Sequence, residues 1–173
     1  METWNAISTR RNVRRFADRP IEERDLERIV EAARLAPSSM NEQRWTFIVC
    51  TDREHVRRLA GSGDYAGHLA GAPAAIAFLT PSVDDAAEAE SITFDLGQAV
   101  ENAMLAAWDL GIGSCHASVY DEERARELLG YPTELRCHLF ISLGYPATTM
   151  SPPGSAGGRK PFAEVVHRER YGP

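Results

Sequence analysis

Apolar residues recur at every third or fourth position in several stretches of the chain, which is the spacing of an amphipathic helix. The clearest stretch is 21–36, and Pro37 should end it. Its apolar face consists of Leu26, Ile29, Val30 and Ala33. The same spacing predicts further helices at 3–11, 52–60, 84–111 and 121–130. The helix at 84–111 has a broad, alanine-rich apolar face, so it can approach a neighbouring element closely.

Four other runs are apolar and rich in β-branched and aromatic residues, which is typical of buried strands. They lie at 44–51, 72–80, 113–120 and 135–146. Helices and strands alternate without a regular βαβ repeat, so the pattern predicts an α+β layered fold. No internal repeat is found, and we expect a single domain over residues 1–173.

The C-terminal part of the chain has a different character. Residues 147–158 are rich in Pro, Gly and Ser, which predicts a flexible loop, and residues 61–71 read as a loop or one loose helical turn. The tail beyond residue 158 nevertheless carries four large apolar residues: Phe162, Val165, Val166 and Tyr171. We expect this tail to dock on another surface, such as a second subunit.

Composition narrows the classes of function. The chain has 173 residues, 43% of them hydrophobic, which suits one globular domain. A net charge of -6 disfavours nucleic acid as the main partner. No apolar run approaches the ~20 residues that cross a bilayer, so we expect no membrane association. Three cysteines without CxxC spacing, and no signal-peptide pattern, predict a reducing cytoplasmic location.

Familiar metal and nucleophile motifs are missing from the sequence. Cys115-His116 and Cys137-His138 fall in predicted strands, where neighbouring side chains point to opposite faces, so we expect no metal site. There is neither a GxSxG turn nor a Walker lysine. His116 is the nearest candidate for an acid or base, although a purely structural role is favoured, and we assign no catalytic side chain.

Five arginines crowd into residues 10–19: Arg10, Arg11, Arg14, Arg15 and Arg19. On a helix, residues four apart share a face, and converging guanidinium groups repel each other unless an anion lies between them. A pocket for a small anion is one interpretation. The other is a solvated charged face paired with Asp18, Glu22 and Glu23, which the spacing alone favours.

The segment at 36–45, "APSSMNEQRW", joins a predicted helix to a predicted strand and is dense in hydrogen-bonding groups. Such a segment can bind a flat heteroaromatic ring, but an ordinary capping turn uses the same residue types.

Together these stretches resemble the FMN-dependent nitroreductase family. The residues that carry the resemblance are "RRNVRRF", "APSSMNEQRWTFIV", "DLGQAVENAMLAAWDLGIGSCH", "LFISLGYP" and "GRKPFAEVVHRERYG". They occur in the family's order and cover nearly the whole chain. The resemblance implies a three-layer α+β sandwich, with a central mixed, mainly antiparallel sheet flanked by helices, in an intertwined homodimer that binds FMN at the subunit interface.

The resemblance also implies which residues bind the cofactor. They are Arg10, Arg11, Asn12, Arg14, Pro37, Ser38, Ser39, Asn41, Gly113, Ser114 and Arg159. The arginines would hold the phosphate and the pyrimidine edge of the ring, and the segment from Pro37 to Asn41 would line the ring from the partner subunit. Backbone N–H groups near Gly113 and Ser114 would bond its redox-active edge.

The implied activity is a ping-pong oxidoreduction. NADH or NADPH reduces FMN and leaves, and a small electron acceptor, such as a nitroaromatic or a quinone, then enters the same space. A flavin-binding protein with little or no turnover is the alternative. NADH and NADPH remain open as donors, a deazaflavin remains open in place of FMN, and so does the physiological acceptor.

Overall fold

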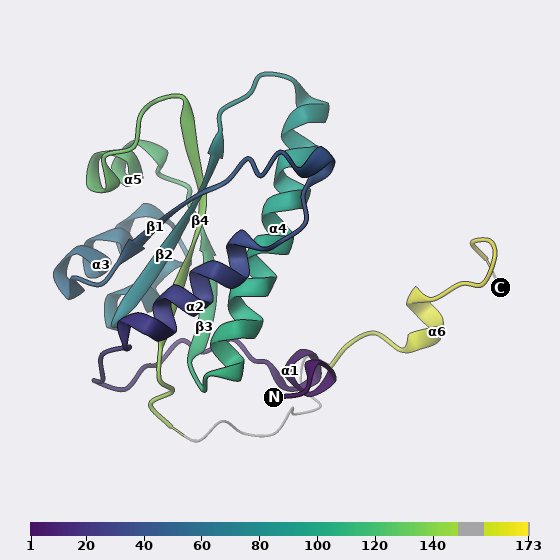
Figure 1. Cartoon of the computed structure of the whole chain (residues 1–173), viewed down its shortest axis with the longest axis horizontal. Helices are drawn as coiled ribbons and strands as arrows, with labels where there is room; N and C mark the ends of the chain where they lie inside the picture. The colour runs from purple at the N-terminus through teal and green to yellow at the C-terminus, as the bar shows by residue number, and fades with distance from the viewer. Residues whose placement is uncertain (149–157, 173) are drawn as a thin grey trace.

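Four antiparallel strands form the centre of the described structure, a computed structural model that describes residues 1–148 and 158–172 (Figure 1). The strands are β1 (Thr46–Cys50), β2 (Ala74–Pro81), β3 (Gly113–Ser118) and β4 (Leu135–Gly144), in the order β1-β2-β4-β3. All three strand pairings are antiparallel. All four predicted strands are therefore confirmed.

Helices cover both faces of the sheet, which confirms the predicted three-layer α+β sandwich. One layer consists of α2 (Glu23–Arg34) and α4 (Ala86–Asp109). The other consists of α3 (Arg53–Leu59), the 3-10 helices η2 (Ala60–Ser62) and η3 (Ala66–Gly71), and α5 (Glu122–Leu129). The remaining elements are α1 (Thr3–Thr9), η1 (Ser39–Asn41) and α6 (Phe162–Val165).

Strand β2 joins the two halves of the core because its successive side chains point to opposite faces. Ile76 and Phe78 pack with α2 and α4, while Ala77 and Leu79 pack with the layer of α3 and α5. All four side chains are at most 1% exposed. Burying a side chain the size of Ile or Phe contributes about 1.5–3 kcal/mol, so this strand anchors both helical layers.

The ends of α4 and α5 are fixed by capping residues. Asp85 and Asp121 cap α4 and α5, because each carboxylate accepts a hydrogen bond from the backbone N–H three residues later. Gly130 ends α5 in the left-handed conformation, with φ +70°, which a residue without a side chain adopts at little cost. For residues 61–71 the sequence predicts a loop or one loose helical turn, and the short helix η3 agrees with the second option, with Ala66 and Leu69 fully buried.

The arginine-rich segment is extended rather than helical. Helix α1 ends at Thr9, and the N–H of Val13 then donates to the carbonyl of Ser114 at 2.9 Å. Farther along, the N–H of Ala17 donates to the carbonyl of Tyr145 at 2.8 Å. The idea that Arg10 and Arg14 share a helical face is therefore wrong, since these backbone groups bond to distant segments and not to a helix.

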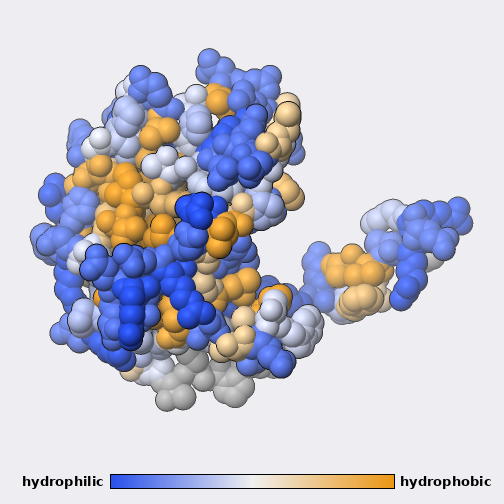
Figure 2. All heavy atoms as spheres, in the orientation of Figure 1, coloured by the Kyte–Doolittle hydropathy of each residue, from blue (hydrophilic) through white to orange (hydrophobic). Residues whose placement is uncertain are grey.

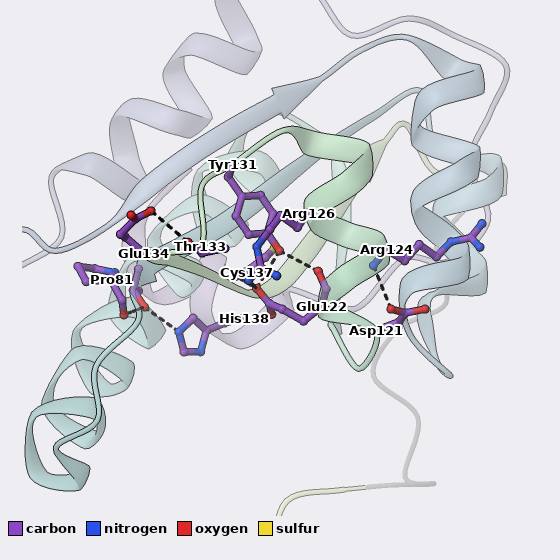
Figure 3. Close-up of polar contacts among 11 residues, drawn as sticks. Pro81, Asp121, Glu122, Arg124, Arg126, Tyr131, Thr133, Glu134, Cys137 and His138 are labelled. Atoms are coloured by element: carbon purple, nitrogen blue, oxygen red, sulfur yellow. Dashed lines mark hydrogen bonds and ion pairs between the residues drawn. The ribbon is translucent and has the colours of Figure 1, made fainter.

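Helix α5 is fastened to β4 by one carboxylate (Figure 3). Oε1 of Glu122 accepts hydrogen bonds from the hydroxyl of Tyr131 at 2.8 Å, the N–H of Cys137 at 3.1 Å and the guanidinium of Arg126 at 3.3 Å. Burial, and secondarily the hydrogen bond to Glu122, raises the pKa of Tyr131. The cluster is therefore structural, and it lies outside the candidate site described below.

The C-terminal segment projects away from the sheet and its helices (Figure 1). Every residue from 158 to 171 is exposed, and Figure 2 shows apolar side chains gathered on this segment. The predicted loop at 147–158 lies mostly outside the described residues. In the described part of the chain, no helix combines the length and apolar character needed to cross a membrane.

We expect Gly113→Ala to lower the free energy of unfolding by about 1–3 kcal/mol, because overpacking a filled site costs this much. A Cβ at Gly113 would lie 2.4 Å from Cγ2 of Val13, so the N-terminal segment would have to move. Gly71→Ala is the matched control, since a Cβ there meets no atom within 4 Å. Urea denaturation of both variants checks this, and equal midpoints would contradict the close packing of Val13 on β3.

Glu122→Ala should lower the free energy of unfolding by about 1–3 kcal/mol, since it leaves the N–H of Cys137 without its acceptor and leaves the hydroxyl of Tyr131 with only the longer, 3.3 Å contact to the backbone carbonyl of residue 122. Glu123→Ala, one residue along the same first turn, should cost about 1 kcal/mol or less. Thermal and urea unfolding compare the two. A similar loss in both variants would mean that the effect comes from the helix dipole alone.

Candidate functional site

A cavity of about 710 Å³ opens where the N-terminal segment crosses β3. It is lined by Arg14, Arg15, Asp64, Tyr65, Gly67, His68, His116, Ala117, Ser118 and Tyr120. These residues come from three places in the sequence, which β3 and η3 bring together. The volume is in the range of ordinary small-molecule sites, about 300–1,000 Å³.

The arginine cluster divides into structural and cavity-lining members. Nε of Arg10 lies 2.9 Å from Oε1 of Glu101, and the guanidinium of Arg11 donates to backbone carbonyls. Arg19 stacks over the ring of Tyr145. Arg14 and Arg15 line the cavity, and neither forms an ion pair within the described residues. The cavity wall therefore holds two cations that are free to bind an anion.

The alternative of a solvated charged face agrees with the exposure of Arg14 and Arg15, but two of the three acids that it invokes pair with other arginines. Asp18 pairs with Arg53 at 2.7 Å, and Glu22 pairs with Arg24 at 2.8 Å. Both acids thus bind arginines outside the cluster.

Gly113 and Ser114 lie at the start of β3, beneath the N-terminal segment. Asn12 forms a parallel bridge with Ser114, and this is the isolated parallel contact beside the antiparallel sheet. The Ser114 hydroxyl is buried and has no hydrogen-bond partner in the described residues. These three residues set the position of the cavity wall, and the next residues of β3, from His116 to Ser118, line it.

The segment after α2 has an unusual backbone. Met40, Asn41 and Gln43 have positive φ values of 49°, 58° and 51°. Two hydrogen bonds hold it: the N–H of Ser39 donates to the buried carboxylate of Asp95 at 3.0 Å, and the N–H of Gln43 donates to the hydroxyl of Ser38 at 3.0 Å. Left-handed non-glycine residues are uncommon and cluster at functional sites, so this segment is a candidate for contact with a ligand.

Within one chain, the segment from Ser38 to Gln43 does not lie beside the arginines of the N-terminal segment. The segment is fixed to Asp95 on α4, whereas Arg10 is fixed to Glu101 on the same helix. Six residues of helix separate the two anchors by about 9 Å along the axis and about 120° around it. Figure 1 shows η1 and α1 toward opposite ends of α4, and Arg159 lies on the projecting C-terminal segment.

Sequence reasoning missed most of the cavity wall, above all His68. Nδ1 of His68 lies 2.7 Å from the hydroxyl of Ser142 on β4. Burial, and then the nearby positive charge of Arg14, lowers the pKa of His68. Only the tertiary structure reveals this residue, since it lies in a glycine-rich stretch with no periodic pattern. His116, considered from the sequence, is exposed and shares the same wall.

The chemistry of the cavity is that of a binding site. Burial raises the pKa of the Cys115 thiol behind the wall, so this cysteine is not an activated nucleophile. In the described part of the chain, no group of three His, Cys, Asp or Glu residues could hold a metal ion. The cavity offers two cations, one carboxylate at Asp64, the imidazole nitrogens of two histidines and the rings of Tyr65 and Tyr120, and the cations and flat rings suit a planar anion.

Comparison with known proteins agrees with this description. The model of the nitroreductase family matches residues 7–62 and 62–145. An Archaeoglobus fulgidus protein named "Putative NADH dehydrogenase/NAD(P)H nitroreductase" is 40% identical over 149 residues, covering 84% of this chain and 86% of that protein. The "FMN reductase [NAD(P)H]" of Bacillus subtilis is 25% identical over 189 residues, covering 98% of this chain and 74% of that protein.

A solved structure extends the similarity to the fold. The FMN-dependent nitroreductase of Clostridium difficile R20291 superposes with a TM-score of 0.84 at 26% identity, covering 98% of this chain and all of that one (100%). The family match covers both layers of the sandwich and the residues that form the cavity. The chain therefore belongs to the nitroreductase family.

Proposed function

We propose that the cavity beside Arg14 binds FMN, and that NAD(P)H and a small electron acceptor use the bound cofactor in turn. The chain is a flavin-dependent NAD(P)H oxidoreductase of the nitroreductase type, with relatives that are named FMN reductase and FMN-dependent nitroreductase. The observation that carries the assignment to this cavity is its pair of arginines without acidic partners in the described residues.

The residues present fit FMN. Arg14 and Arg15 supply fixed positive charge for the phosphate or the pyrimidine edge, and arginine's planar fork binds such oxygens in pairs. Nε2 of His68 is buried without a partner in the described residues, and the cavity that its ring lines has room for a ligand group beside it. When bound, FMN accepts a hydride and passes electrons on, and the protein orients it and tunes its surroundings. The nicotinamide and the acceptor would share one space, which gives ping-pong kinetics.

We further propose that the working form is an intertwined homodimer. The projecting C-terminal segment exposes Phe162, Val165 and Tyr171, which are 73%, 57% and 90% accessible in one chain. A second copy would cover them and bring Arg159 toward a cavity. It would also supply the segment from Pro37 to Asn41, which one chain holds on another side of α4 from Arg10. A cytoplasmic location fits the three cysteines, which are free and buried.

The remaining predicted residues take roles consistent with this arrangement. Asn12, Gly113 and Ser114 position the cavity wall, and Arg10 and Arg11 lie at its N-terminal approach. Pro37, Ser38, Ser39 and Asn41 would contact the ring from the second copy. Storage of FMN without turnover is not favoured, because the relatives are named for reductase activity.

The purified protein, loaded with FMN, should be yellow and should lose its 450 nm absorption on anaerobic mixing with NADH or NADPH. Addition of a quinone or a nitroaromatic should then restore the colour, since the acceptor oxidises the same cofactor. Stopped-flow absorbance checks both half-reactions. A stable yellow complex that neither nicotinamide bleaches would support the storage function instead.

Arg14→Met should weaken FMN binding about 10- to 100-fold, because it removes a charge-assisted contact to the anionic cofactor. Arg24→Met is the matched control, since this arginine is exposed on α2 and pairs with Glu22. Titration calorimetry with FMN measures both. Equal affinity in the two variants would place the cofactor away from this cavity.

A further inference from the structure

The hydrogen bonds around His68 determine which of its nitrogens carries the proton. The hydroxyl of Ser142 donates to the carbonyl of Cys115 at 3.2 Å. A serine hydroxyl has a single proton, so Ser142 satisfies both contacts, the one to Cys115 and the 2.7 Å one to Nδ1 of His68, when the histidine donates. Ser142 is fully buried, so these two contacts are the hydrogen bonds that its hydroxyl has in the described structure. Neutral His68 therefore carries its proton on Nδ1 and a lone pair on Nε2.

The lone pair on Nε2 is left without a hydrogen bond. This atom is buried and has no partner within the described residues, although the imidazole lines the cavity. A buried polar atom without a partner costs about 1–3 kcal/mol, and such an atom in a native site calls for an explanation. Protonation of Nε2 would convert it into a donor and place a positive charge in the cavity wall.

The charged neighbours of His68 decide when that proton binds. Burial and the positive charge of Arg14 lower its pKa, and the carbonyl of His116 acts in the opposite direction, with a smaller repulsion from the His116 imidazole. The other titratable groups of the wall are Arg15, Asp64, Tyr65 and Tyr120. The imidazole is therefore neutral at pH 7 in the protein alone. Negative charge beside Arg14 would offset the repulsion and raise the pKa.

We propose that Nε2 of His68 takes up a proton when bound FMN is reduced, so that reduction of the cofactor is coupled to proton uptake by the protein. This inference rests on the proposed function. With FMN bound, a nicotinamide would give up one hydrogen and two electrons from a C–H bond, which would oxidise the nicotinamide and leave the reduced cofactor with one more negative charge. His68 would take up one proton from solvent at Nε2, and this proton balances the added charge.

His68 fits this role better than the other groups in the wall. His116 is exposed, so water can satisfy both of its nitrogens, and no buried serine fixes its tautomer. Asp64 is also exposed. His68 alone in this wall combines a fixed donor on one nitrogen with a buried, unbonded second nitrogen beside a cation. The structure thus assigns it as the group whose charge follows the charge of the cofactor.

The midpoint potential of bound FMN, measured by spectroelectrochemistry between pH 6.5 and 8, tests the coupling. For a two-electron couple, a tenfold change in proton concentration shifts the potential by about 30 mV per proton taken up. The unmodified protein should show about 59 mV per pH unit, which corresponds to two protons. His68→Asn and His68→Gln keep a hydrogen-bond donor but do not titrate, so about 30 mV per pH unit is expected for both.

His55→Asn, which changes a histidine of α3 outside the cavity lining, is the control and should keep the slope of the unmodified protein. A slope near 30 mV per pH unit in the unmodified protein would overturn the inference. So would the larger slope in all variants, since the second proton would then reside on another group. A protein that binds no FMN would instead contradict the proposed function.

Nitrogen NMR of the unmodified, histidine-labelled protein gives an answer even if the His68 variants do not fold. At pH 7.5, reduction of bound FMN should convert one imidazole nitrogen from the unprotonated to the protonated resonance position. If every imidazole keeps its resonances on reduction, the proton is taken up elsewhere and the inference is wrong.

Discussion

The site depends on the backbone pairing between the N-terminal segment and the start of β3. The N–H of Val13 donates to Ser114, and Gly113 has no side chain to keep the two strands of backbone apart. This contact determines where the next residues of both segments lie. Arg14 and Arg15 then follow on one side of the cavity, and His116 to Ser118 follow on the other. A side chain at Gly113 would disturb both walls together.

Charge is distributed unevenly around this contact. The chain as a whole has a net charge of -6, yet the cavity wall holds two arginines without acidic partners in the described residues. Neighbouring arginines have structural contacts: Arg10 with Glu101, and Arg19 with the ring of Tyr145. Local positive potential in a generally acidic protein selects a small anion over a large one such as nucleic acid. An anion-binding role for Arg14 and Arg15, and structural contacts for Arg10 and Arg19, therefore explain the run of arginines in an acidic chain.

The sequence predicted the layers of the fold correctly, but it predicted only part of the cavity wall. Apolar runs rich in β-branched and aromatic residues located the four strands, and helical periodicity located α2, α4 and α5, because these features depend on local residues. The extended shape of residues 10–17 could not be predicted, since its hydrogen bonds go to Ser114 and Tyr145, far along the chain. His68 was missed for the same reason: its partner, Ser142, is 74 residues away. The family resemblance indicated Arg14, but its motifs do not include the stretch from Asp64 to His68.

The most direct test of this account is a crystal structure of the protein grown with FMN. We expect the ring to lie against β3 from His116 to Ser118, with Arg14 and His68 within hydrogen-bond distance of the cofactor. We also expect the segment from Ser38 to Asn41 of a second copy to lie over the ring. FMN bound at another surface, or bound in this cavity with both Arg14 and His68 turned away from it, would contradict the account.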